Sequence, residues 1–174
     1  MVKDIRLLTN YDASYSALII AKYVISECYK QGKPVTNTKL QKILFMIQKE
    51  YLKCFCLCFY ENIEAWEFGP CIPKVYYRYC GCGVMPIRID YREEVLTTLI
   101  DKKDRLIISS VVNKYINKEN LLWEFPLVKR VYEVIPHKLL FYEEILKEKD
   151  CDKRTKEKYD KRATCKNQCE RCEP

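Results

Sequence analysis

The sequence predicts a mainly α-helical fold with a small β-hairpin (α+β), built as one compact helical domain. Several segments repeat apolar residues every three or four positions, as helices with one buried face do. Between two of these segments the period falls to two, which is typical of short strands. With 174 residues, 48% of them hydrophobic, the chain is long enough to bury a core. We expect this domain to span residues 1–149 and a charged, cysteine-rich tail to span 150–174.

Two long helices are expected first. Residues 12–31 form the first, with Asp12 as its N-cap and Gly32 ending it. The second follows the segment PVTNT, where Thr36 or Asn37 provides the cap. Its apolar stripe is Leu40, Ile43, Leu44, Ile47 and Tyr51, while its other, polar face carries Lys39, Lys42, Lys49 and Glu50.

The next segment changes period and predicts the hairpin. Residues 57–67 alternate in character, with Glu61-Asn62 as the turn and Gly69-Pro70 as the end of the hairpin. Pro73 then begins a short helix, since proline suits a first helical turn. A third long helix is expected from about Asp101 to Asn117. A final helix begins near Pro136 and places Leu139, Tyr142 and Leu146 on one stripe.

The eleven cysteines predict no disulfide framework, because the count is odd and the chain begins without the apolar core of a signal peptide. We therefore expect a cytoplasmic protein, without a membrane span, in which four cysteines fill the core: Cys28, Cys54, Cys56 and Cys58. The tail leaves two alternatives open. It carries either reactive thiols at a disordered chain end or a zinc site built from Cys151, Cys165, Cys169 and Cys172.

The charge and the chemistry-bearing residues favour a binding protein over an enzyme. The single histidine, His137, has no nucleophile motif near it, and the four glycines form no phosphate loop, so we predict no catalytic residue and no cofactor. The net charge of +7 is too small for a dedicated nucleic-acid surface. It leaves open an alternative function, a nucleic-acid-associated regulator that uses a basic surface and the C-terminal arm.

The segment EAWEFGPCIPKVYYRY supplies the candidate contact residues for a partner protein. Aromatic residues and arginine provide most interface hot spots, and here they surround a Gly-Pro corner that would be rigid. The candidates are Trp66, Phe68, Gly69, Pro70, Tyr76, Tyr77 and Arg78. The alternative is that Trp66 and Tyr76 are core residues that clamp the hairpin to the next helix.

Two motifs in register resemble the Panacea domain, also called the SocA-like antitoxin or phage-associated protein domain. The helix motif is matched by Thr36, Lys39, Leu40, Gln41, Lys42 and Leu44. The strand and corner motif is matched by Glu64, Ala65, Trp66, Gly69, Pro70, Pro73, Val75 and Tyr76. The resemblance covers about Tyr11 to Lys149 and weakens in the second half, where Leu122 and Leu127 replace a histidine and a tryptophan of the family pattern.

The resemblance implies a helical domain with a small β element that acts as an antitoxin. Such a protein binds and neutralises a cognate toxin by direct contact, and some members look like adaptors that present the toxin to a Clp-type protease. Together with the absence of catalytic groups, these motifs lead us to expect a binding protein and not an enzyme.

Overall fold

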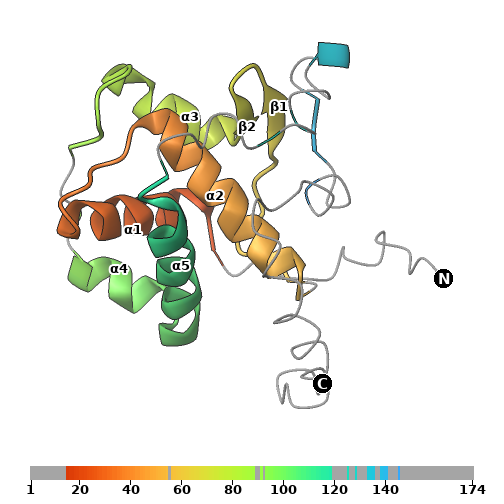
Figure 1. Ribbon diagram of the computed structural model, residues 1–174. Coiled ribbons are helices and arrows are strands. Elements are labelled where there is room, and N and C mark those ends of the chain that lie inside the picture. The colour runs from red at the N-terminus through yellow and green to blue at the C-terminus, as the bar shows by residue number, and fades with distance from the viewer. Residues whose placement is uncertain are drawn as a thin grey trace.

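Helices make up most of the described chain, and one short hairpin interrupts them (Figure 1). The structure, a computed structural model, describes residues 15–54, 56–88, 91, 93–118, 125, 128, 133–135, 138–140 and 145. The elements are α1 (Ala17–Lys30), α2 (Asn37–Leu52), β1 (Glu64–Trp66), β2 (Gly69–Cys71), α3 (Pro73–Tyr79), the 3₁₀ helix η2 (Cys80–Cys82), α4 (Glu93–Leu99) and α5 (Lys102–Tyr115). The predicted fold class, mainly α with a small β-hairpin, is confirmed.

Helix α2 lies at the centre of the fold. It contacts α1, α3, α5 and strand β2, so that Figure 1 shows it between the hairpin and the α1–α5 pair. Because neighbours cover it on several sides, α2 is buried well beyond the predicted apolar stripe. The polar face predicted for Lys42 and Lys49 is therefore wrong, since these side chains are only 2% and 3% exposed. Lys39 and Glu50 remain half-buried.

Side-chain caps fix where the first two helices begin. The Oγ atom of Ser16 accepts a hydrogen bond from Leu18 N at 3.3 Å, and Glu61 Oε2 accepts from Ala17 N at 2.7 Å. The first helix thus begins at Ala17, while the predicted cap Asp12 lies outside the described residues. Thr36 caps α2, as predicted, by accepting from Lys39 N at 3.2 Å. These bonds satisfy amides that a helix N-terminus leaves without partners.

The segment before β1 is not the first arm of a hairpin, so the predicted hairpin over 57–67 with its turn at Glu61-Asn62 is wrong. A buried glutamine, Gln48, holds this segment instead. Its Oε1 accepts from Cys58 N at 3.0 Å and Phe59 N at 3.2 Å, and its Nε2 donates to Phe59 O at 2.9 Å. Tyr15 N adds a bond of 3.2 Å to Cys58 O. The backbone groups that a partner strand would use are thereby already satisfied.

The observed hairpin lies further along the chain. Strands β1 and β2 are antiparallel, with Trp66 opposite Gly69, so Glu67 and Phe68 form its turn. The segment 138–140 lies along the other edge of β1, where Ala65 N donates to Lys138 O and Leu140 N donates to Ile63 O, both at 2.8 Å. The helix predicted from Pro136 is therefore wrong at 138–140. The predicted stripe residues Tyr142 and Leu146, like Pro136, lie outside the described residues.

The remaining helices follow the sequence prediction in part. Helix α3 begins at Pro73 and α5 lies within the predicted range, whereas α4 was not predicted. Of the predicted core cysteines, Cys28 and Cys58 are buried, but Cys54 and Cys56 are exposed because no strand forms there. No described helix is long and apolar enough to cross a membrane.

Candidate functional site

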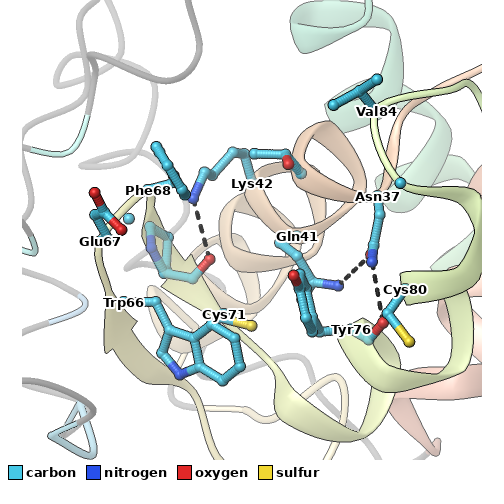
Figure 2. A pocket seen from close by; sticks show the side chains of 14 residues that line it. Asn37, Gln41, Lys42, Trp66, Glu67, Phe68, Cys71, Tyr76, Cys80 and Val84 are labelled. Carbon is cyan, nitrogen blue, oxygen red and sulfur yellow. Dashed lines mark hydrogen bonds between the residues drawn. The ribbon is translucent and has the colours of Figure 1, made fainter.

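A cavity of about 460 Å³ opens at the corner where the hairpin meets α2 and α3 (Figure 2). Its volume lies within the range of pockets that hold small molecules or single side-chain-sized groups. The walls come from the first turns of α2, from the hairpin, and from α3 with the turn that follows. The lining residues are Asn37, Thr38, Gln41, Lys42, Trp66, Glu67, Phe68, Gly69, Pro70, Cys71, Tyr76, Cys80, Gly83 and Val84.

The predicted contact residues meet at this corner, although not all of them line the cavity. Five do so, namely Trp66, Phe68, Gly69, Pro70 and Tyr76. Tyr77 and Arg78 are exposed on α3 and lie outside the lining. Helix α2 contributes a further wall that was not predicted from the sequence. Its lining residues are Asn37, Gln41 and Lys42, which were expected in a helix but not at a binding site.

An aromatic cluster joins the hairpin to α3. The rings of Trp66 and Tyr76 have centroids 4.9 Å apart, and Tyr77 lies 6.2 Å from Trp66 and 5.7 Å from Tyr76. The indole Nε1 of Trp66 donates to Glu64 Oε2 at 2.8 Å. Trp66 and Tyr76 are half-buried, so they clamp the two elements together, whereas Tyr77 is 65% exposed.

Two buried amides tie α2 to both neighbours. Gln41 Oε1 accepts from Ile72 N at 2.9 Å, which fixes the end of β2, and Gln41 Nε2 donates to Asn37 Oδ1 at 3.1 Å. Asn37 Nδ2 in turn donates to Tyr76 O at 3.0 Å, which fixes α3 (Figure 2). The cavity walls are thus preformed, and a preformed site loses less conformational entropy when it binds.

Among the described residues of the cavity wall, Lys42 is the one buried charged side chain. Its Nζ donates to Pro70 O at 3.3 Å, as Figure 2 shows, and lies 5.7 Å from the centroid of the Phe125 ring. Among the described residues no carboxylate forms an ion pair with it. Burial lowers the pKa of the Lys42 amine to about 7, so near neutral pH about half of the molecules carry the charge.

The thiol next to this amine is not an activated nucleophile. Burial raises the pKa of Cys71 to about 12, and the nearby Lys42 lowers it by less. Cys71 is therefore protonated at neutral pH and a poor nucleophile. Cys80 donates from Sγ to Tyr77 O at 3.2 Å. No group of three or more metal-ligating side chains occurs among the described residues, and the tail cysteines and His137 lie beyond them.

The lack of a side chain at Gly69 leaves room for the Lys42 amine, so we expect the Gly69→Ala variant to be destabilised. Gly69 has φ +100°, and a Cβ there would lie 2.7 Å from Lys42 Nζ. We expect the substitution to lower the free energy of unfolding by about 1–3 kcal/mol, because the backbone conformation is strained for alanine. Urea unfolding measures this. The control is Gly81→Ala, which meets nothing within 4 Å and is expected to unfold like the wild type. Equal stability of the two variants would contradict the role given to Gly69.

Comparisons with family models, with curated proteins and with solved structures found no match for this chain. The resemblance to the Panacea domain therefore stays a prediction.

Proposed function

We propose that this protein binds a second protein through the corner formed by the hairpin, α2 and α3, and that it acts as an antitoxin that neutralises a cognate toxin. The observation that carries the proposal is a preformed cavity with exposed aromatic side chains around it. Phe68 is 63% exposed and Tyr77 is 65% exposed, on elements that buried amides hold in place. Large exposed apolar groups on a rigid frame are typical of protein interfaces.

The cavity chemistry supports binding more than catalysis. Acid–base catalysis commonly relies on a pair of titratable groups whose surroundings push their pKa values apart, so that one serves as the acid and the other as the base. Here the wall offers one buried amine, a protonated thiol and the exposed Glu67. Occlusion of the toxin by direct contact needs none of these groups to react. Presentation of the bound toxin to a Clp-type protease would use a further surface of the same protein.

The alternative function, a nucleic-acid-associated regulator, stays a prediction. Its main support, the basic arm at residues 150–174, lies outside the part of the chain that the structure describes. Salt-sensitive retention on duplex DNA that disappears when this arm is removed would favour it.

Co-expression tests the proposed function. The product of the neighbouring reading frame is expected to stop growth when produced alone and to be tolerated when this chain is produced with it. Replacing Tyr77 with alanine should weaken binding by about tenfold or more, because exposed aromatic anchors contribute over 1 kcal/mol. Growth rescue over a range of induction levels measures the change.

Tyr29→Ala is the matched control for this experiment. Tyr29 is 49% exposed on α1, outside the cavity wall, and its replacement should leave rescue unchanged. The antitoxin function would be wrong if the neighbouring product were harmless. The assignment of the surface would be wrong if the two tyrosine variants rescued equally well.

A further inference from the structure

The buried amine of Lys42 is unusual because it lines a cavity and has few partners. The protonated form carries three N–H donors, yet within the described part of the chain Pro70 O is the one acceptor, at 3.3 Å. Buried charges are ordinarily paired with an opposite charge, and no described carboxylate pairs with this one. The site thus has donors that a bound group could use.

The groups around the amine bring little competing negative charge. Cys71 on β2 is a protonated thiol, and Phe125 presents a ring to the amine. Tyr76 and Cys80 also line the cavity. Glu67 lies in the hairpin turn, is exposed, and makes no ion pair with Lys42. Glu64, opposite Cys71 in the hairpin, is half-buried, and its Oε2 accepts from Trp66 Nε1. An anionic group that enters the cavity therefore gains attraction to the amine, while the two carboxylates nearby, Glu64 and Glu67, both keep contact with solvent, which screens their repulsion.

The exposed apolar surface around the cavity indicates whether the anionic group belongs to a small molecule or to a polypeptide. Val84 and Phe68 in the cavity lining are 89% and 63% exposed, and Tyr77 continues the apolar surface on α3 outside the cavity. A small acid held inside about 460 Å³ would leave Tyr77 uncovered. A polypeptide can cover these side chains and place one of its own side chains in the cavity.

We propose that the partner protein inserts an aspartate or glutamate side chain into this cavity, where its carboxylate pairs with Lys42 Nζ while flanking apolar residues cover Phe68 and Tyr77. This inference rests on the proposed function and names the chemistry of the partner. It makes Lys42 a specificity-determining residue, because a neutral side chain in the same place would leave the ammonium unpaired.

The first test uses blocked dipeptides and does not depend on the neighbouring gene product. The probes are acetyl-Phe-Glu-amide and acetyl-Phe-Gln-amide, which differ in one charge. Titration into the full chain is followed by NMR at the backbone amides of Gln41, Gly69 and Cys71. At pH 6 the acidic peptide should saturate with a Kd on the order of 1 mM, at least about tenfold tighter than the neutral peptide.

Two variants make the assignment specific. In Lys42→Met the preference for the acidic peptide should vanish, so that the two peptides bind equally. In Lys103→Met, which removes an exposed lysine on α5, the preference should remain. Because the free amine has a pKa near 7, the acidic peptide should also bind the wild type about tenfold more weakly at pH 8 than at pH 6.

Several results would overturn the inference. Absence of binding by both peptides, equal binding by both, or a preference that survives Lys42→Met would each show that the amine does not receive a carboxylate. Tighter binding of 3-phenylpropionate than of the acidic dipeptide would show that the cavity serves a small acid and not a protein side chain.

The second test separates this inference from the proposed function. If a neighbouring toxin is neutralised by the wild type, Lys42→Met should weaken its binding by at least about tenfold. One Asp→Asn or Glu→Gln change in the toxin should then have no added effect in the Lys42→Met background. Equal neutralisation by wild type and Lys42→Met would leave the antitoxin function standing and refute the carboxylate site. A harmless neighbour would refute the antitoxin function, while the peptide titration would still decide the site.

Discussion

Replacing Gln48 with leucine should destabilise the protein by about 3–5 kcal/mol, because three buried backbone groups lose their hydrogen-bond partner and each costs about 1–3 kcal/mol when left unsatisfied. These groups are the amides of Cys58 and Phe59 and the carbonyl of Phe59. Gln48 is 2% exposed, and Cys58 and Phe59 are fully buried, so water has little access to replace the lost bonds. Urea unfolding followed by far-UV circular dichroism measures the change.

Gln31→Leu is the matched control for this prediction. Gln31 is an exposed glutamine whose Nε2 donates to Asn113 at 2.8 Å, and water can replace that bond. We expect a change within about 0.5 kcal/mol for the control. If Gln48→Leu also stayed within about 1 kcal/mol of the wild type, the segment before β1 would not depend on Gln48 as described.

We also expect the burial of Lys42 to make the free energy of unfolding depend strongly on pH. An unfolded lysine has a pKa of 10.5, whereas burial lowers that of folded Lys42 to about 7. Below pH 7 both states hold the ammonium, and the folded state bears the full cost of burying it. Between pH 7 and 10.5 the folded protein holds the neutral amine while the unfolded chain stays protonated. The free energy of unfolding therefore rises with pH in this window, by up to about 1.4 kcal/mol per pH unit.

Lys42→Met removes this titration, so its stability should lack the rise. The shift of the pKa corresponds to about 5 kcal/mol, and the loss of the bond to Pro70 O offsets about 1–3 kcal/mol of it. The variant should therefore be about 2–4 kcal/mol more stable than the wild type at pH 6. By pH 10 that advantage should fall by about 4 kcal/mol. Urea unfolding at pH 6, 8 and 10 gives the comparison.

Lys103→Met serves as the control here as well. Its side chain is exposed on α5, so the substitution should leave the pH dependence of the wild type in place. The wild type, Lys42→Met and Lys103→Met share the other groups that titrate in this range, so the contributions of these groups cancel when the free energies of unfolding are subtracted. Parallel pH profiles for the wild type and Lys42→Met would mean that the amine remains solvated, and the buried site would then be wrong.

Local signals in the sequence predicted much of the fold. Thr36 capped its helix as expected, because a cap depends on a few adjacent residues. Pro73 likewise began α3. The hairpin was misplaced because alternation of apolar residues does not show which backbone groups are free to pair. Gln48, which lies on a helix preceding that segment, satisfies those groups through its side chain.

The candidate site was predicted on its aromatic side and missed on its polar side. Trp66, Phe68 and Tyr76 stand in one continuous segment, so their composition alone indicated a surface of interest. Lys42 was assigned to a solvated face because helical periodicity identifies one buried stripe and not a second one covered by a distant hairpin. The one sequence signal was its place, with Gln41, in the motif that resembles the Panacea helix.

Titration calorimetry of the purified chain with the product of the neighbouring reading frame tests the central claim most directly. We expect saturable binding with a Kd below about 1 μM. In the double variant Phe68→Ser, Tyr77→Ser the Kd should rise at least about 100-fold, because two exposed aromatic anchors are lost. The Tyr29→Ser variant should bind like the wild type. Absence of binding, or equal affinity of the wild type and the double variant, would contradict the claim that this corner holds a partner protein.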